Sequence, residues 1–176
     1  MVNTGRTEHV LGGHKDSVTC VKWGGTSLIY TASYDRTIIV WDARAGTLVH
    51  HLKSHTARVN QLALSTDFVL RTGFFGHTKN VPDDKADRRA AARDRYEQCL
   101  RREAGTVSER LVSASDDNTM FLWDPTNNGN KPVVRLLGHQ NVVNHICFSP
   151  DVSLIASASF DNQVKIWSAK YVPVGS

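Results

Sequence analysis

Three short segments that end in tryptophan share the same surroundings, and this repetition constrains the fold more than any other feature. They read TIIVWD at 37–42, TMFLWD at 119–124 and QVKIWS at 163–168. An aspartate stands six residues before each tryptophan, a serine two residues before each aspartate, and a histidine after a small residue further upstream. In chain order these sets are His14, Ser33, Asp35 and Trp41; His55, Ser115, Asp117 and Trp123; His139, Ser159, Asp161 and Trp167. Each copy must therefore form the same supersecondary unit.

The spacing within the copies shows where extra chain is inserted. Histidine and aspartate are 21 residues apart in the first copy, 22 in the third and 62 in the second, which places about 40 additional residues in the second copy. Without them the chain holds about three units of ~40–45 residues. Gly-His and Trp-Asp signatures at this period are typical of a WD-repeat β-propeller. We expect repeats over about 8–43, 47–125 and 132–170 within residues 1–176.

The local pattern predicts an all-β fold with four short antiparallel strands per repeat, because β-branched and aromatic runs alternate with turn residues. The expected strands are 18–23, 27–33, 37–41 and 47–52; then 59–64, 110–115, 119–123 and 132–137; then 142–148, 153–159 and 163–167. Residues 9–11 resemble an orphan outer strand of a preceding blade, and 171–176 resemble a shortened last strand. We expect about three blades plus that orphan strand.

A propeller normally closes into a ring of roughly 4–8 blades, so three blades predict a fragment of a larger propeller. Such a fragment should expose two sheet faces and associate or aggregate.

The repeated His, Ser, Asp and Trp residues allow two interpretations. One is a Ser-His-Asp nucleophilic triad. The other is a structural hydrogen-bond network, in which aspartate accepts from histidine, serine continues the chain and the tryptophan indole donates to serine. The set occurs three times with one spacing, whereas an enzyme needs one site, and the chain contains no Gly-x-Ser-x-Gly elbow. The structural network is therefore the favoured interpretation, and no catalytic residue is expected.

Composition and motifs exclude several other classes. The net charge of +4 is mild, and no phosphate-binding Gly-rich motif is present, so no cofactor is expected. His50, His51 and His55 are close in sequence, but neighbouring strand residues face opposite sides, so a metal site is not expected. The three cysteines are odd in number and far apart, which suits a reducing compartment, and Cys20 and Cys147 are predicted to be buried. No apolar run is long enough for a membrane span, and no secretion signal opens the chain.

The insertion at about 65–108 is predicted to contain a basic helix over about 83–104. Ala92, Tyr96 and Leu100 recur at helical spacing with Cys99 beside them, so this stripe should dock on the side of the propeller. The other faces carry seven cations against three acids: Lys85, Arg88, Arg89, Arg93, Arg95, Arg101 and Arg102 against Asp87, Asp94 and Glu97. This surface is either a solvated helix face or a contact for RNA phosphates or an acidic partner.

Longer stretches resemble one family in particular. The chain reads VTCVKWGG at 18–25, LALSTDFVLRTG at 62–73, ERLVSASDDNTMFLW at 109–123, FSPD at 148–151 and ASASFD at 156–161. With the position of the insertion, these stretches resemble the Notchless family of WD-repeat proteins over almost the whole chain. The resemblance implies an eight-bladed propeller after a ubiquitin-like domain, which this sequence lacks. It also implies a nuclear and nucleolar factor bound to precursors of the large ribosomal subunit, with the ubiquitin-like domain engaging the AAA ATPase midasin.

The expected function is a non-catalytic scaffold for pre-ribosomal proteins and ribosomal RNA, without a membrane or small-molecule substrate. The alternative is a general WD-repeat adaptor in Notch-linked signalling or in ubiquitin-ligase substrate recognition. Candidate partner-binding residues flank the repeated sets in turns, where rigid scaffolds usually present contacts. They are Tyr34, Arg36, Asp116, Phe160, Asp16, Arg58 and Asn141, with Arg88, Arg89 and Arg93 on the insertion helix.

Overall fold

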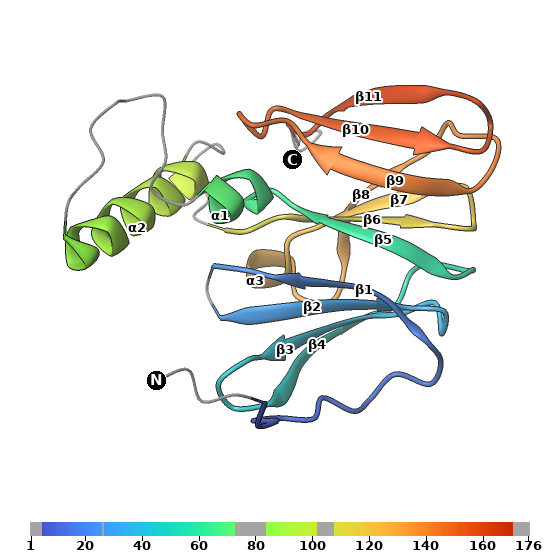
Figure 1. The fold of residues 1–176 in the computed structure, drawn as a ribbon. Coiled ribbons are helices and arrows are strands. Elements are labelled where there is room, and N and C mark those ends of the chain that lie inside the picture. Colours follow the sequence, from blue (N-terminus) through green and yellow to red (C-terminus); the bar gives the residue numbers. More distant parts are fainter. Residues whose placement is uncertain (1–4, 26, 73–83, 102–107, 171–176) are drawn as a thin grey trace.

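The strands form three antiparallel sheets that stack side by side, as Figure 1 shows. The computed structural model describes residues 5–25, 27–72, 84–101 and 108–170. Within these residues the first two sheets have four strands each and the third has three. The first sheet contains β1 (Val18–Trp23), β2 (Leu28–Ser33), β3 (Ile38–Asp42) and β4 (Thr47–Leu52). The second contains β5 (Val59–Leu64), β6 (Leu111–Ser115), β7 (Met120–Trp123) and β8 (Pro132–Leu136). The third contains β9 (Val143–Phe148), β10 (Leu154–Ser159) and β11 (Val164–Ser168).

Each sheet follows the order of the chain, so neighbouring strands are joined by local connections. The first strands β1, β5 and β9 each lie at one edge of their sheet, and β5 contacts both β1 and β9. The register is shifted by one residue between Val18 and Cys20, and again between Val59 and Gln61. Bulges increase the local twist of a strand, and their recurrence shows that the repeats share backbone geometry as well as sequence.

Two apolar layers separate the three sheets. Between the first and second sheets, Tyr30, Ile38 and Val40 pack against Leu62, Leu64, Leu111, Phe121 and Trp123. Between the second and third sheets, Val112, Met120 and Leu122 pack against Val143, Ile146 and Ile155. The second sheet is therefore buried on both faces, as a blade inside a propeller must be. This stacking is the fold that the repeats predict.

Two details of the strand prediction are wrong. Residues 9–11 form no strand, because the sheet that they would join has no counterpart in the described residues, and Val10 is 86 % exposed. Cys147 is also exposed, because its side of β9 faces away from the second sheet, whereas Cys20 is half-buried. Residues 171–176, expected to form a shortened last strand, lie outside the described residues.

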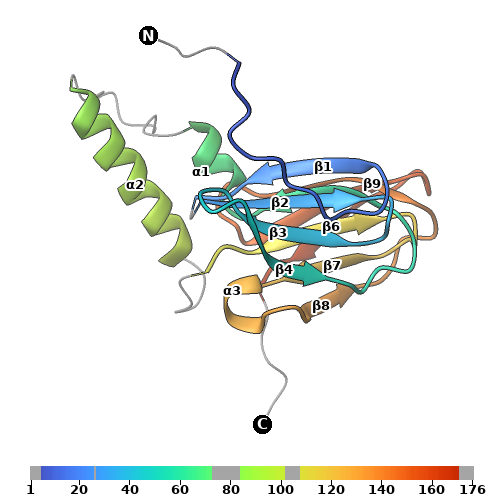
Figure 2. The same ribbon diagram turned by 90° about the horizontal axis from the view of Figure 1, so that it is seen from below.

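The insertion leaves the second sheet after β5 and returns before β6. It contains a short helix α1 (Asp67–Thr72), which the sequence reasoning missed, and the long helix α2 (Lys85–Arg101), whose bounds fall inside the predicted 83–104. A third helix, α3 (Pro125–Asn128), connects β7 to β8. Figure 2 shows α2 beside the ends of the strands rather than over a sheet face. None of the helices in the described part of the chain has the length and apolar character needed to cross a membrane.

Candidate functional site

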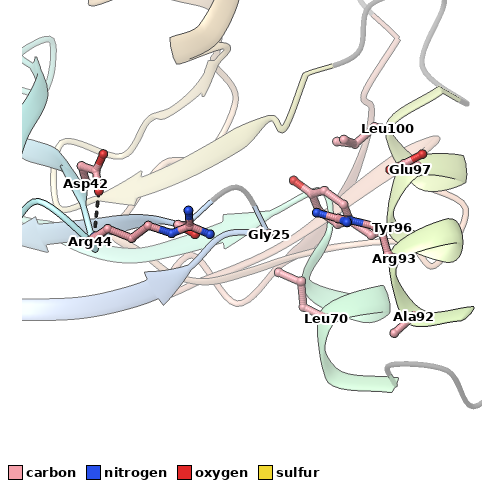
Figure 3. Close-up of a pocket in the computed structure, with 10 residues that line it drawn as sticks. Gly25, Asp42, Arg44, Leu70, Ala92, Arg93, Tyr96, Glu97 and Leu100 are labelled. Carbon is pink, nitrogen blue, oxygen red and sulfur yellow. Dashed lines mark hydrogen bonds between the residues drawn. The ribbon is translucent and has the colours of Figure 1, made fainter. Parts of the chain in front are cut away.

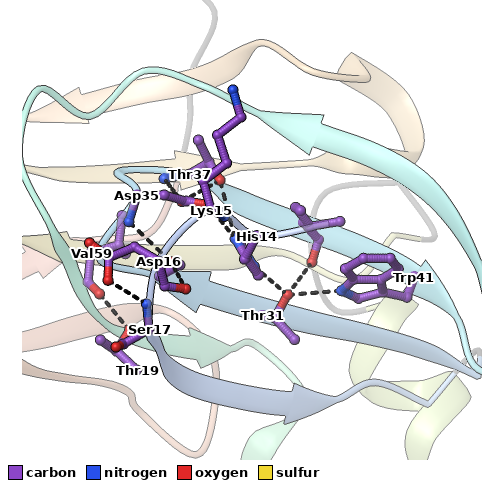
Figure 4. A network of polar contacts seen from close by, with 12 residues as sticks. His14, Lys15, Asp16, Ser17, Thr19, Thr31, Asp35, Thr37, Trp41 and Val59 are labelled. Atoms are coloured by element: carbon purple, nitrogen blue, oxygen red, sulfur yellow. Dashed lines mark hydrogen bonds and ion pairs between the residues drawn. The ribbon is translucent and has the colours of Figure 1, made fainter. Parts of the chain in front are cut away.

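The first of the repeated polar sets is a chain of hydrogen bonds inside the first sheet (Figure 4). The indole Nε1 of Trp41 donates to Thr31 Oγ1 at 2.8 Å, and Thr31 Oγ1 lies 2.8 Å from Nε2 of His14. Nδ1 of the same histidine lies 2.9 Å from Oδ2 of Asp35. With the proton on Nδ1, each donor in this chain finds one acceptor, so the network is internally satisfied.

The other two repeats form the same network. His55 lies 2.9 Å from Asp117 and 2.7 Å from Ser113 Oγ, to which Trp123 donates at 2.9 Å. His139 lies 2.7 Å from both Asp161 and Ser157 Oγ, to which Trp167 donates at 2.8 Å. We call each set of histidine, hydroxyl residue, aspartate and tryptophan a quartet.

The predicted serine of each quartet is wrong, because the hydroxyl that joins histidine to tryptophan lies two residues earlier, at Thr31, Ser113 and Ser157. The predicted Ser33, Ser115 and Ser159 instead brace the turn after their strand. Ser33 Oγ accepts from the backbone N–H of Asp35 and donates to Asp16 O, and the other two do the same in their repeats. Strand residues two apart share a face, so both hydroxyls lie on the quartet side, but the earlier one reaches the histidine.

The geometry resembles a Ser-His-Asp triad, but the hydroxyl is placed where it cannot meet a substrate. Ser113 is fully buried and Ser157 is 2 % exposed. Each hydroxyl also accepts an indole N–H, which occupies the oxygen that a nucleophile would use. A catalytic serine needs an open approach and an oxyanion site. The quartets thus have the arrangement of a buried hydrogen-bond network that holds the strands of each sheet together.

The quartet aspartates are held in their charged form. Burial raises the pKa of Asp117, but hydrogen bonds from His55, Thr119 and the N–H of Thr56 outweigh it and leave the pKa well below its usual range. The same balance holds at Asp35. Burial raises its pKa, but hydrogen bonds from Thr37, Lys15 and His14 outweigh this effect and lower the pKa well below its usual range. At Asp161 the opposing effects lower the pKa to about 2, with no threonine hydroxyl among the donors.

The predicted turn residues gather at the quartet end of the three sheets. Tyr34, Asp116 and Phe160 occupy equivalent positions, since their backbone N–H groups donate to Ser17, Arg58 and Val142 respectively. The guanidinium of Arg58 lies 4.6 Å from the centre of the Tyr34 ring. Asp116 accepts from Asn60 at 2.8 Å, and Asn60 also donates to Val143 O in the third sheet.

We call this set the turn surface: Tyr34, Arg36, Asp116, Phe160, Asp16, Arg58 and Asn141. All of them except the half-buried Asp116 are exposed. A groove of about 380 Å³ lies between the first two sheets here, lined by Ser17, Val18, Thr19, Tyr34 and Asn60. The structure thus brings Tyr34, Arg58 and Asp116 close to the boundary between two blades, whereas Phe160 projects from the third sheet.

The insertion forms a second surface at the opposite end of the strands. The predicted stripe does dock: Cys99 and Leu100 are buried, and Cys99 packs with Val69 and Val152. Residues 86–90 are exposed, whereas the buried residues Cys99 and Leu100 lie near the C-terminal end of α2. The predicted cations Arg88, Arg89 and Arg93 lie on the exposed part, and we call these three the helix surface.

A larger groove of about 720 Å³ lies between α2 and the first sheet (Figure 3). Its lining includes Arg44 from the first sheet and Arg93, Tyr96 and Glu97 from the helix. The groove therefore combines a tyrosine ring with charges of both signs.

A buried glutamate that sequence reasoning missed holds the insertion to the first sheet. Glu109 is 4 % exposed and accepts hydrogen bonds from Thr66, from Tyr30 at 3.1 Å and from the N–H of Gly25 at 3.3 Å. Burial raises the pKa of Glu109 even though these donors lower it. Its position directly before the predicted strand 110–115 is the only sign of this role in the sequence.

The histidines near residue 50 do not converge. His55 belongs to its quartet, and His50 Nδ1 lies 3.0 Å from Oδ1 of Asn130 in the turn between α3 and β8. Among the described residues, no group of three or more His, Cys, Asp or Glu side chains could hold a metal ion.

Comparison with known proteins agrees with the repeat geometry. The family "WD domain, G-beta repeat" matches residues 5–42, 104–124 and 130–168. The chain is 64 % identical over 170 residues to ribosome assembly protein 4 of Chaetomium thermophilum, covering 97 % of this chain and 33 % of that protein. It is 46 % identical to ribosome assembly protein 4 of Saccharomyces cerevisiae, over 93 % of this chain and 32 % of that protein. It is 47 % identical to the protein Notchless of Drosophila melanogaster, over 82 % of this chain and 29 % of that protein.

The chain thus spans about a third of the length of these curated relatives. The family matches fall on the three sheets, and the repeated quartets recur once in each of them. The resemblance to Notchless proteins that the sequence motifs indicate is confirmed. We conclude that the chain belongs to the WD domain, G-beta repeat family and forms three blades of a β-propeller of the Notchless type.

Proposed function

We propose that this chain is a non-catalytic docking platform in the assembly of the large ribosomal subunit. The observation that carries the proposal is the burial of the histidine, hydroxyl and aspartate side chains of the quartets, which makes the sheets rigid and leaves function to exposed surfaces. Similarity to proteins named ribosome assembly protein 4 supports ribosome assembly as the process in which the platform acts. The expected location is the nucleus and nucleolus, where such particles are assembled. Binding to midasin rests on the family resemblance alone.

The helix surface is the proposed contact with the precursor particle. Arginine guanidinium groups pair well with phosphate oxygens, and their attraction for RNA weakens as salt rises. Arg88, Arg89 and Arg93 are all exposed, so a large partner can reach them, and Arg93 also borders the groove between α2 and the first sheet. The aspartates of α2 lie between these arginines in the sequence. The proposed contact therefore depends on the positions of the arginine charges as well as on the net charge of the helix.

The test is a charge reversal on this helix. The variant R88E/R89E/R93E should lose most of its co-sedimentation with purified large-subunit precursor particles at moderate salt. A matched control, K15E/K53E/K131E, makes the same change in net charge at exposed lysines elsewhere. The control should keep its binding. Equal loss of binding in both variants would show that only the net charge matters. Unchanged co-sedimentation of the arginine variant would show that the helix surface is not the contact.

A general WD-repeat adaptor is the second candidate, and the turn surface favours it. Phe160 is 62 % exposed and Tyr34 is 39 % exposed, and exposed aromatic side chains are common anchors in protein interfaces. In that case Y34A and F160A should weaken capture of a protein partner, while R88E/R89E/R93E should have no effect. The two sets of variants lie at opposite ends of the sheets, so they report on the two candidates separately.

A further inference from the structure

The groove between α2 and the first sheet has two walls that face each other (Figure 3). One wall contains the turns of the first sheet at Gly25 and Arg44, and the other contains residues of α1 and α2. Every lining residue lies between positions 25 and 100, so neither end of the sequence forms a wall. The volume of about 720 Å³ is within the range of roughly 300–1,000 Å³ that is usual for ligand pockets in proteins.

Two arginines reach into this groove from opposite walls. Arg44 comes from the turn between β3 and β4, and Arg93 comes from α2. Both side chains are exposed. Within the described part of the chain, neither of them forms an ion pair with a carboxylate. Two guanidinium groups in one groove, without a carboxylate bound to either, favour an anionic ligand.

The two carboxylates in the lining are engaged within the molecule. Oδ1 of Asp42 accepts from the backbone N–H of Arg44 at 2.7 Å and from that of Ala45 at 3.0 Å. Glu97 is not unpaired either. The arginines are therefore the charged groups of the groove that a ligand can pair with.

A tyrosine ring lies beside these arginines and is held in place. Tyr96 is half-buried, and it packs against the apolar cluster of Val69, Cys99 and Val152. A Cβ on Gly25 would lie 2.1 Å from a ring carbon of Tyr96, so only glycine leaves room for the ring at this place. The ring therefore presents a preformed aromatic surface to the groove that it lines.

An aromatic ring next to cations is the combination with which proteins bind single-stranded nucleic acid. Unpaired bases stack on the ring, and the phosphates pair with the cations. An acidic peptide would pair with the arginines but would gain no stacking from the ring. The bases of a double helix are already stacked on each other, so they cannot enter a groove of this kind. The ring thus favours an unpaired nucleotide over either alternative.

We propose that this groove binds an unpaired nucleotide of an RNA strand, with the base on Tyr96 and the flanking phosphates on Arg44 and Arg93. The inference rests on the proposed function, because it takes RNA to be the partner of α2. It extends the contact from the helix surface, to which Arg93 also belongs, onto the first sheet. Arg44 and Tyr96 are then RNA-binding residues outside the helix surface.

The first test measures how the 176-residue chain binds a fluorescently labelled oligouridine of about eight nucleotides, followed by fluorescence anisotropy at moderate salt. R44A should weaken binding about tenfold, because it removes a charged hydrogen-bond donor to phosphate. K53A, the matched control, removes one charge at an exposed lysine directly after β4 and should leave the affinity unchanged. Equal losses in both variants would show unspecific attraction and overturn the proposal.

The second test concerns the ring. Y96F keeps the aromatic surface and should bind oligouridine like the original chain, whereas Y96L keeps an apolar side chain without the ring and should bind about tenfold more weakly. Circular dichroism checks that Y96L is folded. R44A examines the same groove from the other wall, so the test does not depend on Y96L alone. Equal affinity of Y96F and a folded Y96L overturns the proposal.

Competition distinguishes the possible occupants. Unlabelled oligouridine should displace the labelled strand, whereas an RNA duplex of the same length should do so much less well. Polyglutamate should not displace it at matched charge concentration. Displacement by polyglutamate as efficient as that by oligouridine would make the groove a site for an acidic peptide and overturn the proposal.

The inference and the proposed function can fail separately. Arg88 and Arg89 belong to the helix surface but do not line the groove. If R88E/R89E loses co-sedimentation with precursor particles while R44A still binds oligouridine fully, only the groove is excluded. If R88E/R89E keeps its co-sedimentation while R44A and Y96L lose oligouridine binding, the groove is supported and the contact through the helix surface is wrong.

Discussion

The second sheet and the first sheet carry the same repeat but differ in what surrounds them. Leu64 of the second sheet is fully buried, whereas Trp23, at the equivalent place in the first sheet, is 65 % exposed. The quartet tryptophan Trp123 is fully buried, and its equivalent Trp167 in the third sheet is half-buried. In stacked repeats stability is a sum of intrinsic and neighbour contributions. The comparison indicates that the presence of a covering sheet decides how much a given residue contributes to the free energy of unfolding.

The largest expected effect is the loss of a core side chain in the second sheet. L64A should lower the free energy of unfolding by about 2–5 kcal/mol, because it leaves a cavity between two sheets. W23A, at the equivalent position, should change it by less than about 0.5 kcal/mol, because this side chain is 65 % exposed. Urea unfolding followed by circular dichroism measures both. Equal losses would show that the first sheet is covered as well as the second.

The quartet hydroxyls give the next largest difference. S113A should cost about 1–3 kcal/mol, because it leaves the buried His55 Nε2 and Trp123 Nε1 without their partner. S157A should cost less, because the half-exposed Trp167 can bond to water instead. The same unfolding measurement compares them. A larger loss for S157A would contradict the idea that neighbour burial sets the cost.

The acid dependence of stability should also differ between the sheets. Since the folded pKa of Asp117 is lowered, its contribution is present above the unfolded value of about 3.9 and is lost as the pH falls toward the folded pKa. The lowered pKa of Asp161, about 2, acts in the same direction. We therefore expect the free energy of unfolding to depend less on pH between pH 5 and pH 2.5 in both variants, D117N and D161N. The reduction should be larger for D117N than for D161N. Identical slopes would show that the added Thr119 hydroxyl has no effect.

The smallest expected effect concerns a turn in the first sheet. Arg36 has φ of +71°, and the equivalent residues Asn118 and Asn162 have φ of +64°. Asparagine adopts this left-handed region more easily than arginine. R36N should raise the free energy of unfolding by up to about 1 kcal/mol, and N118R should lower it by a similar amount. Thermal unfolding of the two variants checks the sign, and a destabilised R36N would show that the arginine side chain holds the turn.

Much of the fold follows from the spacing of the repeats. The histidine, aspartate and tryptophan of each quartet are recognisable because they recur at the same intervals and are all needed to satisfy one buried network. The hydroxyl was misplaced because Ser33, Ser115 and Ser159 are identical in type, whereas Thr31 breaks that identity in the first copy. What the network requires is a hydroxyl at the right distance from the indole, and threonine provides it as well as serine.

The insertion was predictable only in part. The apolar stripe of α2 was visible from helical spacing, because Cys99 and Leu100 follow Tyr96 by three and four residues. The burial of Glu109 was not, because its donors Thr66, Tyr30 and Gly25 come from distant parts of the chain. The separation of the helix and turn surfaces at opposite ends of the strands likewise depends on tertiary structure.

The insertion starts and ends at adjoining points of the second sheet. Ser65 N donates to Arg110 O at 2.9 Å, and the N–H of Arg110 donates to Ser65 Oγ at 3.0 Å, so the two ends of the excursion are fastened to each other. Because entry and exit meet, the blade closes without help from the segment between them. Residues 65–110 are thus a natural exchange point, where evolution or an engineer can replace one accessory module with another and keep the blade intact.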